Sequence, residues 1–322
     1  MAGEMPADRL PIIEWASWWN LTIDRWRGEG LPDDLDGSGI KRFFGLDMDY
    51  QLWVPSMAPV EIPRVSDSTV GRITCEAEYD ALRPYLYPDP VPFDRDLWRK
   101  RTAEQEDGSA ILWITLEGFF WWPRVLFGIE PHLYAFYDHP DLMHRINRDE
   151  TDYMRRCIEA VCQVFTPDFM TIAEDMSYNH GPMISRGQFD EFMAPYYHEI
   201  VPVLQDRGIT VLIDSDGDIE PLIPWFESAG IEGILPLERM AGVDVARIRE
   251  RHPRWKMIGA FDKTVMQNGE QAIRQEFERL LPVMRSGRFI PSVDHQTHPG
   301  VSIEDYRLYL SLLREYCEKA VG

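Results

Sequence analysis

The last two-thirds of the chain alternates short runs of β-branched and apolar residues with longer stretches in which apolar residues recur at helical spacing. The short runs predict strands at residues 111–115, 169–173, 211–214, 233–236, 257–261 and 289–293. The longer stretches predict helices at residues 139–165, 186–207, 219–229, 243–251, 270–285 and 303–320. Such alternation is typical of a parallel α/β sheet, and the number of units favours a closed (β/α)8 TIM barrel over an open doubly wound sheet.

The first third of the chain has a less regular pattern. Residues 10–26 carry apolar side chains at roughly helical spacing and predict a helix, whereas residues 50–79 contain short β-prone pieces broken by prolines and predict a small antiparallel meander. The first two strands of the barrel must also come from this part. We therefore predict one domain over residues 1–322, with residues 1–110 as an N-terminal elaboration that includes those strands.

Composition limits the kinds of partner and the cellular location that we expect for this protein. The 33 Lys and Arg residues face 54 Asp and Glu residues, and the net charge of −21 opposes binding to nucleic acid or to an anionic membrane surface. No apolar run approaches the roughly 20 residues of a membrane span. The four cysteines lack CxxC spacing and the N-terminal stretch lacks an apolar signal segment, so we expect a cytoplasmic protein. A homodimer is one oligomeric state that the sequence leaves open.

Acidic residues follow most of the predicted strands. In a barrel of this class the reactive groups stand at the carboxyl ends of the strands, which meet at one rim. The residues at these positions are Glu117, Glu174, Asp175, Asp214, Asp216, Glu238, Asp262, Lys263, Asp294 and His295. Any one of the acids could instead cap a helix. Their convergence from separate strands predicts a site at the rim.

Two of these acids lie in the stretch TVLIDSDGDIEPLIP, residues 210–224, which reads as a strand, a tight turn and a helix. Asp218 is explained as the cap of the helix, but Asp214 and Asp216 have no such local role. Carboxylates this close repel each other unless a cation, a proton or a basic partner lies between them. The residues thus predict either a divalent cation held by Asp214, Asp216 and His295, or carboxyl groups that act as general acids and bases.

Other side chains near the same rim are candidates for contact with a small-molecule substrate. Trp121 belongs to an aromatic run at residues 119–122, and Tyr178 and His180 lie in the loop that follows Glu174. Ordinary packing beneath the rim is the simpler explanation of an aromatic run, and a loop histidine is often only solvated. Lys263 and Asp294 are further candidates because they also follow predicted strands.

Several segments together resemble the uroporphyrinogen decarboxylase superfamily. They are WASWWNLTIDRWRGEGLP, AEDMSYNHGPMISRGQFDEFMAPYYHEIV, VLIDSDGDIEPLIPWFESAGIEGILPLE, IGAFDK and FIPSVDHQTHPGVSIEDYRLYL. The resemblance covers most of the chain from about residue 15 onward. It implies a single (β/α)8 barrel whose cleft faces the carboxyl ends of the strands. It implies either of two activities, because the superfamily contains porphyrinogen decarboxylases and zinc-dependent methyltransferases linked to corrinoid proteins.

Two departures from the family patterns bear on the activity. The arginine-containing N-terminal motif RQAGRY of the true porphyrinogen decarboxylases is absent. The methyltransferase branch holds zinc with a His-x-Cys-Gly motif and a later cysteine, and this resemblance places Asp214 at the histidine, Asp216 at the first cysteine and His295 near the last cysteine. Oxygen ligands are harder than thiolates, so a methyl ether or similar oxygen-bound substrate fits better than a thiol.

The resemblance therefore implies a methyltransferase that demethylates a small, aromatic or other methylated substrate and passes the methyl group to a corrinoid protein. In this interpretation Asp214, Asp216 and His295 hold a divalent metal, zinc in the family, while Glu174 or Asp175 moves a proton. The first alternative is a decarboxylase of uroporphyrinogen or a related acid, in which Asp214 or Asp262 stabilises a protonated intermediate. The second alternative is a barrel that binds a small molecule without catalysis.

Overall fold

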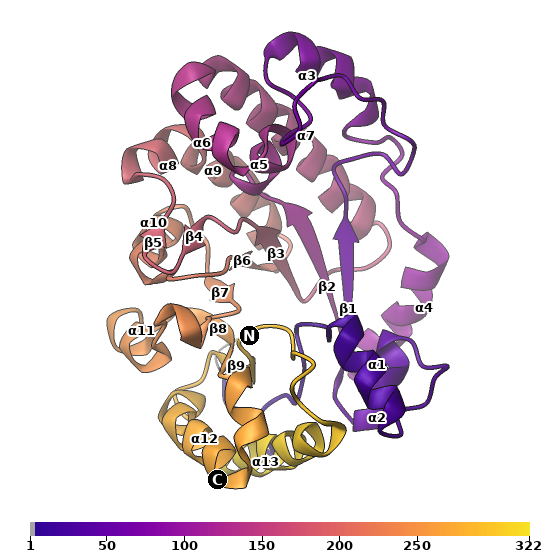
Figure 1. Cartoon of the computed structure of the whole chain (residues 1–322), viewed down its shortest axis with the longest axis vertical. Coiled ribbons are helices and arrows are strands. Elements are labelled where there is room, and N and C mark those ends of the chain that lie inside the picture. Colours follow the sequence, from indigo (N-terminus) through magenta and orange to yellow (C-terminus); the bar gives the residue numbers. More distant parts are fainter. Residues whose placement is uncertain (1–3) are drawn as a thin grey trace. The chain divides into compact units, whose positions relative to one another are not determined.

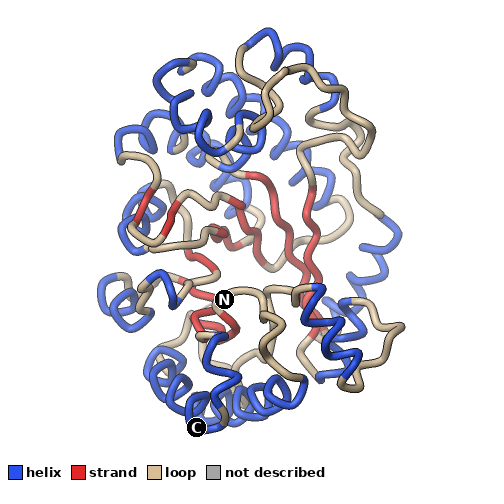
Figure 2. The backbone as a smooth tube through the Cα atoms, viewed as in Figure 1, coloured by secondary structure: helices blue, strands red, loops and turns tan. Residues whose placement is uncertain are grey.

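The computed structural model describes residues 4–322, so the first three residues of the N-terminal stretch lie outside the described part. The chain forms two compact units. Among the described residues, the first unit contains residues 4–49, 216–220 and 233–322, and the second contains residues 50–215 and 221–232. Each unit combines strands with helices (Figure 1), and Figure 2 shows the strands by colour. None of the helices within residues 4–322 combines the length and apolar character needed to cross a membrane.

The second unit contains most of the strands and the long central helix. Its strands are β1 (Met48–Val54, which begins in the first unit), β2 (Ala110–Glu117), β3 (Phe169–Ala173), β4 (Ser177–Tyr178), β5 (Gly181–Pro182) and β6 (Thr210–Asp214). Its helices are α3 (Glu76–Leu82), η1 (Arg83–Tyr85), α4 (Arg95–Glu106), α5 (Trp121–Phe127), α6 (Ile129–Asp138), α7 (Pro140–Cys162), α8 (Arg186–Phe192), α9 (Ala194–Gln205) and α10 (Ile223–Ser228), with η2 (Glu220–Leu222) at its boundary.

The first unit carries the C-terminal strands and helices. Its strands are β7 (Gly233–Leu235), β8 (Lys256–Phe261) and β9 (Phe289–Val293). Its helices are α1 (Asn20–Gly28), α2 (Gly37–Phe44), η3 (Arg239–Ala241), α11 (Val245–Arg251), η4 (Lys263–Asn268), α12 (Glu270–Met284) and α13 (Ile303–Val321). In this unit α12 and α13 lie side by side (Figure 1).

Strand pairing confirms the predicted α/β class. β2 pairs with β3 and β3 with β6 in the second unit, and β7 pairs with β8 and β8 with β9 in the first, all in parallel. Together with β1 these are seven strands within residues 4–322, one fewer than the eight of a closed barrel. The strands β4 and β5 form a separate antiparallel pair. The prediction of a closed (β/α)8 barrel is therefore confirmed only as far as its parallel α/β class.

The six predicted strands are confirmed within two residues at either end, because β-branched and apolar runs coincide with buried strands. The single helix predicted over 186–207 is instead divided into α8 and α9, and Ser185 and Gln188 form a capping box at the start of α8.

Two expectations for the first third are wrong. Residues 10–19 are not helical: Leu10 donates its backbone N–H to Cys317 at the end of α13, and Trp15 donates its own to Ser292 in β9, so tertiary contacts replace helical hydrogen bonds. The meander at 50–79 is reduced to the end of β1 and one antiparallel bridge between Met57 and Leu86. Prolines at 55, 59 and 63 cannot donate to a strand ladder, which explains the loss.

Candidate metal site and surrounding carboxylates

Three side chains of the first unit come together as a set of metal-ligand type. Asp216, Glu238 and His295 each offer one ligand atom, and these three atoms lie within 4.8 Å of one another. His295 Nε2 lies 3.6 Å from Asp216 Oδ2, and both side chains are about one-third exposed, at 32% and 38%. Glu238 follows β7 and His295 follows β9, as expected for groups at the carboxyl ends of strands.

The spacing of these atoms fits a divalent ion. Ligands about 2.1 Å from a tetrahedral metal lie about 3.4 Å apart, close to the separation between His295 and Asp216. Two carboxylates and one imidazole suit zinc, manganese or ferrous iron, whereas the absence of a thiolate makes the set harder than a cysteine-containing zinc site. The partial exposure leaves room for further ligands from a substrate or from water.

Local backbone geometry holds this set in place. Gly217, next to Asp216, has a φ of 84° and donates its N–H to Glu238 Oε2 at 2.9 Å. A left-handed φ is readily adopted by glycine, which explains the residue at this turn. The Trp15 ring meets the His295 ring edge-on at 6.3 Å, and its Nε1 donates to the backbone oxygen of Val293 at 2.7 Å. Glu238 is thereby held directly by a backbone N–H, and the ring beside His295 is held by a backbone oxygen.

Asp294, beside His295, is fully buried. It accepts hydrogen bonds from Lys263 Nζ at 3.0 Å, from Lys263 N at 3.4 Å and from Arg239 N at 3.1 Å. Burial raises the pKa of the Asp294 carboxyl, while the Lys263 charge and the hydrogen bonds oppose that rise. Asp262 accepts from the backbone N–H of Thr264 at 2.9 Å and from its hydroxyl at 2.6 Å, so it caps η4.

In the second unit, Glu174 is a buried anchor for the loop after β2. Its carboxylate accepts the backbone N–H groups of Phe119 (2.8 Å), Phe120 (2.7 Å) and Trp121 (3.1 Å), and the hydroxyl of Tyr197. Burial raises the pKa of Glu174 to about 7, although these donors favour its charged form. With four donors on two oxygens, Glu174 positions this loop, and its role as a proton carrier stays a prediction.

Two other predicted residues of the second unit, Asp214 and Asp175, lie at or just after strand ends. Asp214 ends β6, and its backbone oxygen accepts from Glu174 N at 2.9 Å and Asp175 N at 3.3 Å. Asp175 has a φ of 41°, rare for a residue other than glycine. Asp214 lies outside the set formed in the first unit, so its place as a metal ligand stays a prediction.

The aromatic candidates of the second unit have separate surroundings. Tyr178 is 49% exposed and meets His180 edge-on at 5.6 Å across the β4–β5 hairpin. Trp121 carries the Arg124 guanidinium over its ring at 4.9 Å. The structure thus brings Tyr178 and His180 together, and substrate contact by any of the three stays a prediction.

Two carboxylates at predicted strand ends, Glu238 and Glu117, were given no specific role from the sequence. Glu238 follows a predicted strand, and that position was the available signal for including it among the metal ligands. Glu117, at the end of β2, accepts from Trp53 Nε1 at 3.2 Å, while its buried Oε2 has no hydrogen-bond partner among residues 4–322. Burial raises the pKa of Glu117. Its unsatisfied oxygen could not be foreseen, because it depends on the burial around the strand end.

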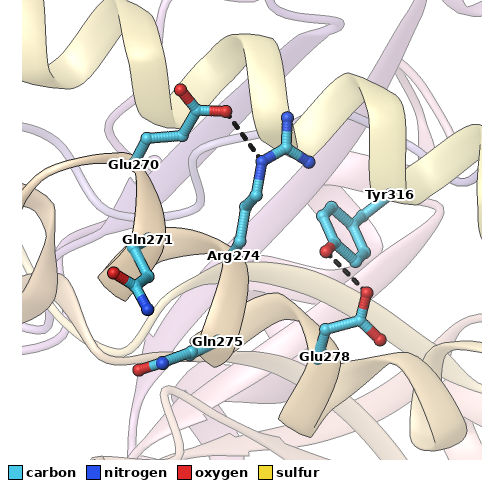
Figure 3. Close-up of a pocket in the computed structure, with 6 residues that line it drawn as sticks. All are labelled: Glu270, Gln271, Arg274, Gln275, Glu278 and Tyr316. Atoms are coloured by element: carbon cyan, nitrogen blue, oxygen red, sulfur yellow. Dashed lines mark hydrogen bonds and ion pairs between the residues drawn. The ribbon is translucent and has the colours of Figure 1, made fainter.

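A surface groove on α12 and α13 offers a different chemistry (Figure 3). It is lined by Glu270, Gln271, Arg274, Gln275, Glu278 and Tyr316. Arg274 pairs with Glu270 at 2.8 Å, and the Tyr316 hydroxyl donates to Glu278 at 2.7 Å. Because the charged groups and the tyrosine of this groove already have partners and the groove lies on the surface, the carboxylate and imidazole set is the better candidate for chemistry.

Comparison with known proteins identifies the family of this chain and solved structures that resemble it. A model of the uroporphyrinogen decarboxylase (URO-D) family matches residues 126–316. No curated protein matches the chain significantly. A methyltransferase from Methanosarcina mazei has a similar structure over 96% of this chain and 94% of its own, with a TM-score of 0.63 and 11% identity, which shows a shared fold alone.

A second solved structure is more distant. It is a protein from Listeria monocytogenes described as a vitamin-B12 independent methionine synthase, similar over 98% of this chain and 96% of its own, with a TM-score of 0.45 and 11% identity. The family assignment depends on neither structure. Because the URO-D model matches more than half of the 322 residues, the chain belongs to the uroporphyrinogen decarboxylase family.

Proposed function

We propose that this member of the family is a metal-assisted methyltransferase. It removes a methyl group from a small, oxygen-methylated substrate and passes the group to a corrinoid held by a separate protein. The observation that carries the proposal is the set of Asp216, Glu238 and His295, whose ligand atoms are spaced for one divalent ion. The resemblance to the methyltransferase branch, with harder ligands in place of thiolates, supports an oxygen-bound substrate rather than a thiol.

In this proposal the ligand side chains are held in place before a metal binds. A divalent metal bound here supplies a Lewis acid that polarises the oxygen losing its methyl group. Glu238 is held by the Gly217 N–H, so its second oxygen is available as a ligand. The Trp15 ring packs against the His295 ring and restricts its rotation. The chain contributes a pre-formed ligand set that needs little reorganisation on binding.

The reaction balances without a further oxidant. The bond between the methyl carbon and the substrate oxygen breaks, and the oxygen keeps the bonding electrons and takes up a proton. The reduced corrinoid supplies the electron pair of the new carbon–cobalt bond. The proton comes from solvent, which reaches the partly exposed side chains of the set.

Metal analysis joined to a transfer assay tests this proposal. We expect the purified protein to bind about one zinc or manganese ion per chain. Mixed with reduced cobalamin and a panel of methoxylated aromatic acids, the metal-loaded protein should convert the reduced corrinoid to its methylated form, which is followed by visible absorption. Glu238→Ala should lower the rate by about 100-fold or more, because it removes a ligand of the Lewis acid.

Glu270→Ala is the matched control, because Glu270 lies on α12 and pairs with Arg274 on the surface. Its rate should stay within about twofold of the unaltered protein, as surface substitutions have small effects. A protein that binds no metal, or a Glu238→Ala variant with full activity, would exclude the metal-assisted reaction.

The family match also favours a second candidate, a decarboxylase of uroporphyrinogen or a related acid. Incubation with porphyrinogen substrates separates the two, because carbon dioxide release supports the decarboxylase and methylation of the corrinoid supports the transferase. A third candidate, a non-catalytic binder of a small molecule, predicts neither product and ligand binding that survives Glu238→Ala.

A further inference from the structure

Asp294 lies where the loops after three strands of the first unit meet. It directly follows β9, accepts the backbone N–H of Arg239 after β7, and accepts both the ammonium and the backbone N–H of Lys263 after β8. The side chain is fully buried, and Lys263 is only 13% exposed. A buried carboxylate with this many donors is held in a single orientation.

The hydrogen bonds of Asp294 and its neighbours connect the loops of all three metal-ligand residues. Gly217, the neighbour of Asp216, donates to Glu238 at 2.9 Å. Arg239, the neighbour of Glu238, donates to Asp294 at 3.1 Å. Asp294 is the neighbour of His295, whose imidazole lies 3.6 Å from Asp216. Each ligand residue is therefore next in sequence to a residue that forms a hydrogen bond with the loop carrying another ligand.

We propose that Asp294 is the positioning residue of the metal site, setting the separation between Glu238 and His295 without itself touching the ion. This inference rests on the proposed metal-binding function. Contacts behind a metal ligand hold its orientation and raise affinity because less freedom is lost on binding. Asp294 acts on two ligands at once, through its own peptide to His295 and through the Arg239 N–H to Glu238.

The chemistry of this position requires a carboxylate. Oδ2 accepts from Arg239, and Oδ1 accepts from Lys263. Asparagine has one acceptor and one donor, so Asp294→Asn must point an N–H₂ group at either the Arg239 N–H or the Lys263 ammonium. One of the two contacts is lost, and the Glu238 loop or the β8 loop is released.

Zinc titration of the metal-free full chain by calorimetry tests the inference. Asp294→Asn should bind zinc about 10- to 100-fold more weakly than the unaltered protein, the range for loss of a contact behind a ligand. Asp305→Asn makes the same chemical change at the capping box of α13, where Asp305 pairs with Ser302, and should leave the affinity within about threefold. Circular dichroism checks that each variant is folded.

Loss of a negative charge could by itself weaken cation binding, so a second variant removes both charges. Lys263→Met with Asp294→Leu replaces a buried ion pair by apolar groups, a change that folded proteins often tolerate. Local net charge is unchanged, but the link from Arg239 is lost. Positioning predicts that zinc affinity stays about 10-fold or more below that of the unaltered protein.

Each outcome supports or overturns a defined claim. If the unaltered protein binds no zinc, manganese or ferrous iron, the proposed metal function and this inference both fail. If it binds metal and both Asp294→Asn and the double variant bind with equal affinity, only the positioning role of Asp294 is overturned. The same holds if the double variant regains full affinity, since charge alone would then explain the single variant.

Discussion

At the scale of single residues, buried carboxyl groups show how surroundings set the affinity for a proton. Glu14 of the first unit is fully buried and accepts from the hydroxyls of Tyr309 at 2.8 Å and Ser292 at 3.3 Å. Burial raises its pKa to about 8, and the two hydroxyls only partly offset this rise. Glu174 has four donors, including backbone N–H groups, and its pKa rises only to about 7. In both groups burial is the largest effect on the pKa, and the hydrogen bonds oppose it.

A pH-dependent stability follows for Glu14. Its folded-state pKa lies above its ordinary value of 4.5, so the folded protein keeps a proton that the unfolded chain releases between pH 4.5 and about 8. The free energy of unfolding therefore falls as pH rises through this window, by up to about 5 kcal/mol from this group. Glu14→Gln removes the titration, so the variant should gain stability relative to the unaltered protein with rising pH.

Urea denaturation at several pH values between about 5 and 8 measures this difference. Unchanged spacing between the two stability curves across the window would contradict the assignment of the raised pKa to Glu14.

At the scale of elements, the start of α5 depends on a close approach of backbone to the Glu174 carboxylate. A Cβ atom added at Gly118 would lie 2.2 Å from the carboxyl carbon of Glu174 and 2.5 Å from the backbone oxygen of Ala173. Gly118 N also donates to that oxygen at 2.8 Å. Only glycine allows the loop to reach the carboxylate that accepts its N–H groups.

Gly118→Ala should therefore lower the stability of the protein by about 2 kcal/mol or more, because backbone atoms cannot move aside as a flexible side chain would. Gly187→Ala in α8 is the matched control. Its added Cβ would meet nothing closer than Ser185 Oγ at 3.9 Å, and alanine favours a helix by roughly 0.5–1 kcal/mol. Thermal melts of the two variants should shift in opposite directions, and equal shifts would contradict this account of Gly118.

Elements that the sequence predicts well differ physically from those it misses. β3 and β9 are short buried runs and α7 is a long amphipathic stretch, so their own periodicity reveals them. Residues 10–19 carry helical spacing but bond to α13 and β9, because long-range partners outcompete a weak local preference. Within the site, Asp216 and His295 follow from strand ends, whereas the contact of Asp294 with the Arg239 N–H depends on loop geometry.

At the scale of the whole molecule, charge and family membership restrict the chemistry. A net charge of −21 opposes phosphate-rich partners, and the acidic strand ends favour a cation as the bound group. Family membership and the parallel α/β fold are shown, and both agree with the resemblance visible in the sequence. The family contains more than one activity, so the choice of reaction depends on the site.

An anomalous-scattering map at the zinc edge, from crystals of the full chain grown with zinc, tests the central claim most directly. The account predicts a peak bounded by Asp216, Glu238 and His295, with each ligand atom about 2.0–2.2 Å from it. The same crystals of Glu238→Ala should show a weaker peak or none. A zinc ion bound by other residues, or an empty set of these three in zinc-soaked crystals, would contradict the account.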